Sequence, residues 1–180
     1  MYGVLTPEMQ AIVKQHVQGR TVWDLGAGDL GYAEMMFGLG ASGVIAVDKK
    51  TMPVSLMPGL VKLQGYFHEI QPPGGIDVAF LAWPQNNSLD GLLPLLCHSK
   101  KVIYLGSNTG GSACGNVDLF KYLLSRKVLA HVPNRRNSLI VYGDFVKRAR
   151  RPLPDEWAAL HQEQVYSLES ATEASEASEE

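Results

Sequence analysis

Cysteine is scarce in this chain of 180 residues, and the two cysteines that occur, Cys97 and Cys114, do not have the spacing of metal ligands. Two cysteines are also too few for a disulfide scaffold. Cys97 lies in an apolar stretch and is therefore expected in the core. The chain has no uninterrupted apolar run of about 18 residues and no signal-peptide pattern at its start. We therefore expect a cytoplasmic protein with no membrane contact and no metal site.

Catalytic patterns that depend on several polar side chains are also missing. The sequence shows no paired carboxylates, no Ser-His-Asp order and no internal repeat. At 180 residues the chain has room for one domain with a good core. Little sequence is left for a second, substrate-holding domain of the kind that a dehydrogenase usually has.

Charge is distributed unevenly along the chain. The formal net charge is −2, but five glutamates lie in the last twelve residues, and without them the net charge would be +3. These glutamates are Glu169, Glu173, Glu176, Glu179 and Glu180. Basic residues precede them in a cluster and in a pair further upstream: Lys147, Arg148, Arg150 and Arg151, and Arg135 and Arg136. Such clusters bind phosphate backbones, although a solvated basic surface accounts for them as well.

The strongest pattern lies in the segment TVWDLGAGDLGYAEMMFGLGASGVIAVDKK, residues 21–50. An apolar run typical of a buried parallel strand, Thr21–Leu25, leads directly into a glycine-rich turn. Tyr32–Leu39 then has the apolar spacing of a helix, and Val44–Val47 is a second apolar run that ends at Asp48. The pattern predicts strand, turn, helix and strand, which is one βαβ half of a nucleotide-binding sheet.

Two cofactor classes use such a turn. The spacing Gly26-x-Gly28-x-x-Gly31, with Asp48 about 20 residues downstream, fits the dinucleotide-binding fingerprint. Asp24 argues against it, because a carboxylate at the end of a buried strand is costly without a positively charged partner. S-adenosylmethionine would supply that charge, since its methionine end has an ammonium group with a sulfonium beside it. An α/β protein with an ordinary glycine turn and no cofactor is the third interpretation.

The segments DLGAG and GVIAVD together resemble the first motifs of the class I, Rossmann-like S-adenosylmethionine-dependent methyltransferases. The resemblance extends over roughly residues 21–143 when the later strands are included. By position it implies that Asp24 faces the methionine ammonium, that the glycines let the backbone approach the cofactor and that Asp48 holds the ribose. The residues that it places at the cofactor are Asp24, Gly26, Ala27, Gly28, Asp48, Lys49, Tyr66 and Phe67. One position departs from the family, because many members have glycine where this chain has Leu30.

The adenine side of the expected site is less like the family. Two prolines in Lys49–Gly59 leave room for at most a turn or two of helix before a strand at Leu60–Gln64. The family commonly has an acid after this strand for the adenine amino group, whereas this chain has Tyr66. Adenine would then be held by backbone groups and by stacking on Phe67. Packing of both aromatic rings in the core is the alternative.

The acceptor side is expected beyond a strand at Ile76–Ala82, because ligands of open α/β sheets lie at the carboxyl ends of the strands. Relatives that methylate amino groups often have Asn or Asp, two prolines and an aromatic residue at this point. This chain has Ala82-Trp83-Pro84, which argues against the adenine- or glutamine-methylating branch. Trp83 could stack on a flat acceptor and Asn86 could bond to it, so these two are the candidate catalytic residues. A tryptophan that covers the core and an asparagine that caps the next helix form the alternative.

Apolar periodicity completes the expected fold. Helices are predicted at residues 6–18, Leu89–Cys97, Asn116–Ser125 and Asp155–Tyr166, and further strands at Lys100–Leu105, Val128–Val132 and Ser138–Tyr142. The fold class is α/β, a Rossmann-like, doubly wound, mostly parallel seven-stranded sheet with a closing antiparallel strand. Residues 1–150 are expected to form a single domain, residues 151–166 a helix docked on it and residues 167–180 a disordered acidic tail.

The function implied by the resemblance is transfer of a methyl group from S-adenosylmethionine by direct displacement. This reaction mainly requires alignment of the acceptor with the sulfonium and exclusion of water. The acceptor is left open between RNA, protein and a small molecule, and a partner subunit could complete the site. The alternative is a non-catalytic S-adenosylmethionine- or dinucleotide-binding regulatory module.

Overall fold

The computed structural model describes residues 4–72, 74–85, 91–107, 114–134 and 137–146. The strands are β1 (Thr21–Leu25), β2 (Gly43–Asp48), β3 (Leu60–Gln64), β4 (Ile76–Ala82), β5 (Ser99–Gly106), β6 (Arg126–Val132) and β7 (Ser138–Phe145). The helices are α1 (Pro7–Val17), α2 (Gly31–Gly38), α3 (Leu92–Cys97) and α4 (Val117–Leu124), with a short 3₁₀ helix, η1 (Phe67–Glu69). None of the helices in these ranges is long and apolar enough to cross a membrane.

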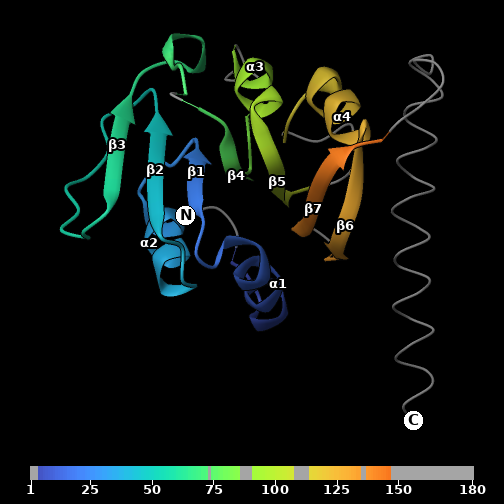
Figure 1. Ribbon diagram of the computed structural model, residues 1–180, viewed down its shortest axis with the longest axis horizontal. Helices are drawn as coiled ribbons and strands as arrows, with labels where there is room; N and C mark the ends of the chain where they lie inside the picture. The colour runs from blue at the N-terminus through green and yellow to red at the C-terminus, as the bar shows by residue number, and fades with distance from the viewer. Residues whose placement is uncertain (1–3, 73, 86–90, 108–113, 135–136, 147–180) are drawn as a thin grey trace.

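The seven strands form one sheet in the order β3-β2-β1-β4-β5-β7-β6, which Figure 1 shows from left to right. Neighbours from β3 to β5 are parallel, whereas β7 runs antiparallel to both β5 and β6. The structure therefore confirms the fold class predicted from the sequence.

The predicted bounds of the elements are mostly close to the observed ones. Strands β1, β3 and β4 begin and end at the predicted residues, whereas β6 and β7 each extend further at their shared end. The third helix begins later than predicted, because Gly91 has a left-handed backbone with φ of 78° and α3 starts only at the next residue. The helix predicted at Asp155–Tyr166, the tail at 167–180 and the basic residues 135–136 and 147–151 lie outside the described residues.

Helix α1 illustrates how local sequence fixes an element. The hydroxyl of Thr6 accepts a hydrogen bond from the backbone N–H of Met9 at 3.2 Å, and Pro7 occupies the first helical position. The helix buries Met9, Val13 and Val17, which recur at the spacing of one helical face. The predicted amphipathic helix is thus confirmed within one residue at each end.

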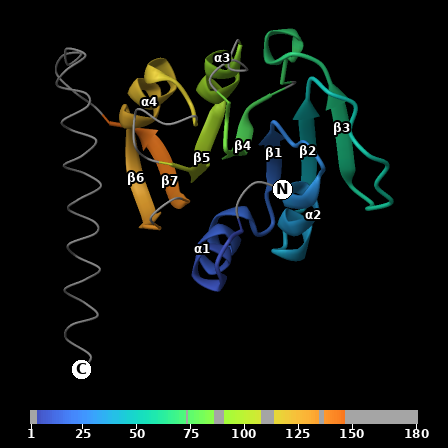
Figure 2. The same cartoon turned by 180° about the vertical axis from the view of Figure 1, so that it is seen from behind.

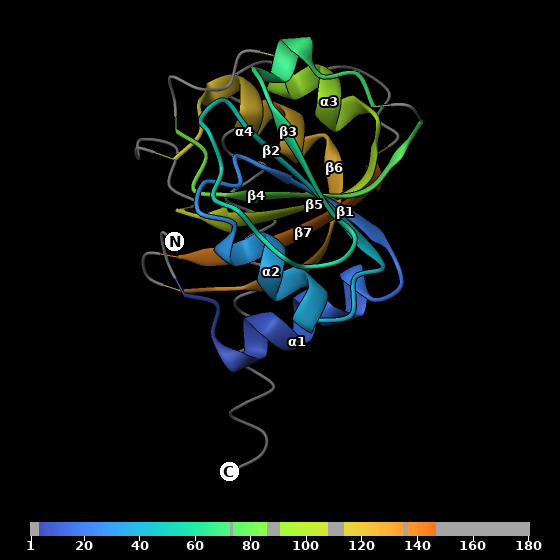
Figure 3. The same cartoon turned by 90° about the vertical axis from the view of Figure 1, so that its left-hand side faces the viewer.

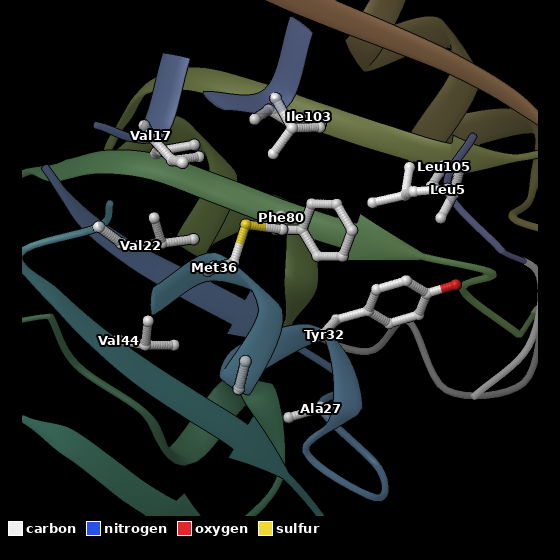
Figure 4. Close-up of a cluster of buried hydrophobic side chains, with 14 of the residues drawn as sticks. Leu5, Val17, Val22, Ala27, Tyr32, Met36, Val44, Phe80, Ile103 and Leu105 are labelled. Carbon is white, nitrogen blue, oxygen red and sulfur yellow. The ribbon is translucent and has the colours of Figure 1, made fainter. Parts of the chain in front are cut away.

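The sheet lies between two layers of helices. Figure 3 shows α1 and α2 on one side of the sheet and α3 and α4 on the other, and the view from behind in Figure 2 shows the same separation. Successive strand residues point to opposite faces, so the buried side chains form two clusters. The cluster on the α1 and α2 side includes Val22, Val44, Phe80 and Ile103, and the other includes Trp23, Ala79, Leu81 and Tyr104. Figure 4 shows Tyr32 and Met36 of α2 pointing toward Phe80 of β4.

Arg126 is a fully buried arginine that joins four elements, and the sequence did not single it out. Its side chain is 1% exposed and donates hydrogen bonds to the carbonyl oxygens of Leu96, Ser99 and Gly143 at 2.8–3.0 Å. It also donates to the Tyr122 hydroxyl at 2.7 Å. These bonds connect the end of α3, the start of β5, α4 and β7, so Arg126 stabilises this corner of the fold.

The expectation that Cys97 is a core residue is wrong. Helix α3 buries Leu92, Leu95 and Leu96, and Cys97 at its last position is exposed. The apolar run is longer than the face that one short helix can bury, which is why composition alone misplaced the thiol.

Candidate functional site

Asp24 is a buried acid near the carboxyl end of β1, in the middle of the sheet. It is 1% exposed, and its register partners are Ala46 of β2 and Phe80 of β4. Among the described residues, no group hydrogen-bonds its Oδ2 atom. Burial, followed by the charges of Asp48 and Asp29, raises the pKa of Asp24 to about 7. An unpartnered buried carboxylate is energetically costly, so a positively charged ligand bound beside Asp24 would stabilise its ionised form.

The glycine-rich turn carries the chain from β1 over the end of β2. The N–H groups of Gly26 and Ala27 both donate to the carbonyl oxygen of Val47, at 2.8 and 3.0 Å. Gly26 has φ of 92°, and a Cβ atom added to this residue would meet no atom within 4 Å. The backbone at Gly26 therefore has a conformation that favours glycine and faces open space, as close approach of a ligand requires.

Leu30 has a backbone conformation that favours glycine. Its φ of 67° and ψ of 4° are left-handed, and it lies directly before α2. A left-handed conformation costs a residue with a side chain about 1–2 kcal/mol. The side chain is 1% exposed within the core on the α1 and α2 side, and this burial offsets the cost.

Asp48 is held at the end of β2 by two backbone N–H groups. Its Oδ2 accepts from Gly28 at 2.9 Å and its Oδ1 accepts from Lys50 at 2.8 Å. Each oxygen has a second lone pair, so the carboxylate can still accept hydrogen bonds from a ligand such as a ribose. Lys49 follows directly and is exposed. Asp24 and Asp48 therefore lie on neighbouring strands at the same edge of the sheet.

Tyr66 and Phe67 lie beyond β3 at this edge, but their environments differ. The N–H of Gly65 donates to the Asp48 carbonyl at 3.0 Å, which brings the following residue close to the end of β2. The Tyr66 ring is stacked on His68, and the residue is 56% exposed. Phe67 is half-buried and packs against the core on the α3 side. Core packing thus describes Phe67, whereas Tyr66 presents its ring at the surface.

A close backbone contact fixes the segment that carries these rings. A side chain at Gly91 would place its Cβ atom only 2.3 Å from the backbone nitrogen of His68. Only glycine allows η1 and the start of α3 to approach this closely. The position of Tyr66 and Phe67 therefore depends on a contact between one segment that precedes β4 in the sequence and one that follows it.

Trp83 has a second left-handed backbone, with φ of 50°, directly after β4. Its indole Nε1–H donates to Oδ1 of Asn137 at 2.8 Å, and the Asn137 amide donates to the Val4 carbonyl at 3.2 Å. Strained residues of this kind cluster at functional sites. Trp83 is half-buried and tied to the start of β7 and to the N-terminal segment, while Asn86 lies outside the described residues.

The structure thus brings most of the predicted site residues to one edge. Asp24 and Asp48 lie at the carboxyl ends of the neighbouring strands β1 and β2. Tyr66 follows β3, and Trp83 follows β4 on the other side of β1. Sequence reasoning missed Asn137, because no local signal joins residues 54 positions apart. The centroid of the Tyr32 ring lies 5.2 Å from that of the Phe80 ring. Burial, followed by the charges of Asp24 and Asp29, raises the pKa of the Tyr32 hydroxyl to about 12.

Comparisons with known proteins agree with this architecture. The sequence matches no protein-family model and no curated protein. The ribosomal protein L11 methylase from Lactobacillus delbrueckii subsp. bulgaricus matches with a TM-score of 0.56 and 16% identity, over 81% of each chain. An rRNA methylase from Streptococcus thermophilus matches with a TM-score of 0.56 and 10% identity, over 81% of this chain and 99% of that one.

A third solved structure was determined with ligands. The 1,6-didemethyltoxoflavin-N1-methyltransferase from Burkholderia thailandensis, with bound 1,6-didemethyltoxoflavin and S-adenosylhomocysteine, matches with a TM-score of 0.58 and 13% identity, over 76% of each chain. At such low identity these likenesses show the fold. This chain has the Rossmann-like fold that these methyltransferases share.

Proposed function

We propose that this chain is a methyltransferase that binds S-adenosylmethionine and transfers its methyl group directly to an acceptor. The observation that carries the proposal is Asp24, a buried carboxyl group with an oxygen that no described residue hydrogen-bonds. It lies beside a glycine turn that is open on one side. An ammonium group bound at this point would supply the missing partner for the carboxylate.

The charge of the site favours S-adenosylmethionine over a dinucleotide. A dinucleotide would place its pyrophosphate against the glycine turn. Three carboxylates surround this turn, those of Asp24, Asp29 and Asp48, and the charges of the last two contribute to the raised pKa of Asp24. A pyrophosphate would add further negative charge to this cluster, whereas an ammonium and a sulfonium would reduce its repulsion.

The remaining roles follow from position along the edge. Gly26, Ala27 and Gly28 would admit the cofactor to the backbone, and Asp48 would accept hydrogen bonds from its ribose hydroxyls. Lys49 and Tyr66 would flank the ribose and adenine, because both lie exposed beside the end of β2 and the end of β3. Phe67, which is half-buried, would contribute to the adenine wall from below.

On the acceptor side, Trp83 and Asn86 would orient the group to be methylated. Bound S-adenosylmethionine supplies a methyl group that a sulfonium activates for displacement. The residues of the chain then need only to align the acceptor and exclude water. The hydrogen bond from Trp83 to Asn137 and the left-handed backbone of Trp83 would hold the indole in one orientation for this purpose.

The acceptor itself is not restricted by the fold. The matched proteins are named as methylating a ribosomal protein, rRNA and a small heterocycle. We therefore keep RNA, protein and a small molecule as acceptor classes, and a partner subunit that completes the site is compatible with each. A cytoplasmic location remains a prediction, which cell fractionation would test.

Calorimetric titration with S-adenosylmethionine, S-adenosylhomocysteine and NAD tests the cofactor. We expect the first two to bind, and Asp24→Asn to weaken this binding by about 100-fold or more, because it removes one partner of a buried charge pair. Asp77→Asn is the matched control, since Asp77 lies at the other edge of the sheet and pairs with Lys100 at 2.7 Å. Binding of NAD alone would refute the assignment.

Transfer is tested separately from binding. Incubation of the protein with cell extract and S-adenosylmethionine labelled on its methyl group should label one class of acceptor. Trp83→Ala should reduce this labelling while cofactor binding persists. Binding without labelling of any fraction would instead indicate the non-catalytic regulatory module.

A further inference from the structure

A second charged region lies at the opposite edge of the sheet, where the parallel strands begin. Arg20 directly precedes β1, Lys101 lies near the start of β5 and Lys127 lies at the start of β6. These strands are separated by β4 and β7 in the sheet. With strands about 4.8 Å apart, the three cations extend over about 19 Å of the edge.

Arg20, Lys101 and His16 lie close together at the centre of this region. Nζ of Lys101 lies 3.2 Å from Nδ1 of His16, at the end of α1. Burial, followed by the charges of Lys101 and Arg20, lowers the pKa of His16, so the imidazole is neutral and accepts this hydrogen bond. Burial, followed by the charge of Arg20, also lowers the pKa of Lys101.

Two described acids, Asp77 and Asp144, act on these cations from beyond ion-pair distance. Neither Arg20 nor Lys101 forms an ion pair with a described carboxylate. Asp77 on β4 is paired with Lys100 at 2.7 Å and also interacts with the charge of Arg20, and Asp144 acts on Lys101 without a direct ion pair. The half-buried Lys101 therefore has a neutral histidine as its partner, an arrangement that a bound anion would stabilise.

We propose that Arg20, Lys101 and Lys127, which together with the neutral His16 form what we call the basic edge, bind the phosphate backbone of a single-stranded nucleic acid. A cluster of like charges at close range stabilises a bound phosphate, and the length of the row fits a polymer of phosphates better than one phosphate. The basic edge lies opposite the cofactor edge, so this inference does not depend on the proposed methyl transfer.

The salt dependence of binding tests the basic edge. The full chain is titrated against a fluorescent single-stranded RNA of about 20 nucleotides, and a DNA of the same sequence, between about 50 and 200 mM salt. For the double variant Arg20→Gln/Lys101→Gln we expect the slope of log affinity against log salt to decrease by about 1.4, since each contact contributes about 0.7. The matched control Lys50→Gln/Lys62→Gln removes two exposed lysines near the far end of the sheet and should leave the slope unchanged.

A replacement variant and a cofactor-binding measurement distinguish the possible outcomes. If thermal melting shows that the double variant is unfolded, Lys127→Gln replaces it, with an expected decrease in slope of about 0.7. Equal slopes in variant and control, or no binding of either nucleic acid, would overturn the proposal, as would displacement of the RNA by micromolar inorganic phosphate. S-adenosylmethionine binding by Arg20→Gln/Lys101→Gln and by Lys127→Gln should be unchanged, so failure of the basic edge is distinguishable from failure of the cofactor site.

Discussion

Replacement of Asp24 by asparagine should make the free protein less sensitive to pH. The pKa of this carboxyl group is raised from 3.8 to about 7 in the folded state, mainly by burial. A raised pKa means that the folded state holds the proton more tightly than the unfolded state. The stability from this group is therefore fully present below about pH 4, and it is lost as pH rises to about 7.

The size of the effect follows from the shift. Three pKa units correspond to about 4 kcal/mol, and about 3 kcal/mol of this is lost between pH 5 and pH 8. Asp24→Asn cannot ionise, so its free energy of unfolding should gain about 3 kcal/mol relative to the wild type over that interval. The change in unfolding free energy between the two pH values does not depend on the cost of burying the asparagine side chain, because that cost is the same at both.

Urea denaturation at pH 5, 6, 7 and 8 measures this relative change. Asp77→Asn is the control, because its bond to Lys100 lowers the pKa of Asp77, so this carboxylate stays ionised from pH 5 to pH 8 and its removal should shift the stability by the same amount at each pH. Parallel stability curves for the wild type and Asp24→Asn would refute the reasoning. In the wild type, affinity for S-adenosylmethionine should also rise from pH 6 to pH 8 as Asp24 loses its proton, and it should be flat in the variant.

Four other substitutions test single features. Arg126→Met leaves several buried carbonyl oxygens unpartnered and should lower the urea-derived stability by about 3–5 kcal/mol. Gly91→Ala forces a backbone clash and should lower the melting temperature and weaken cofactor binding, whereas Gly74→Ala, where a Cβ meets no atom within 4 Å, should do neither. Leu30→Gly should be about 1 kcal/mol more stable than Leu30→Ala, because both lose the buried side chain but only alanine keeps the left-handed strain; the reverse order would contradict this account. Burial lowers the pKa of His131, so the protein loses folding stability as pH falls below about 6.5 and the unfolded state takes up a proton at this ring. His131→Leu should lessen the loss of unfolding free energy between pH 7 and pH 5, as measured by urea titration at the two pH values.

The sequence by itself determined the elements and the class of the fold. Runs of buried apolar residues and helical periodicity depend on local spacing, so β1, β3 and β4 were predicted with their observed bounds. The glycine turn and the placement of Asp24 and Asp48 at strand ends were also readable, because parallel strands bring their carboxyl ends to one edge. These features need only the order of residues along the chain.

Only the tertiary structure decided which groups have partners. The Asp24 oxygen that no described residue hydrogen-bonds and the carbonyl cluster around Arg126 depend on sheet order, which apolar patterning does not encode. The bond from Trp83 to Asn137 joins residues 54 positions apart, and Cys97 is exposed because α3 buries a different face. Hydrogen bonding and burial are properties of packed neighbours, and these are set by the pairing of strands far apart in the sequence.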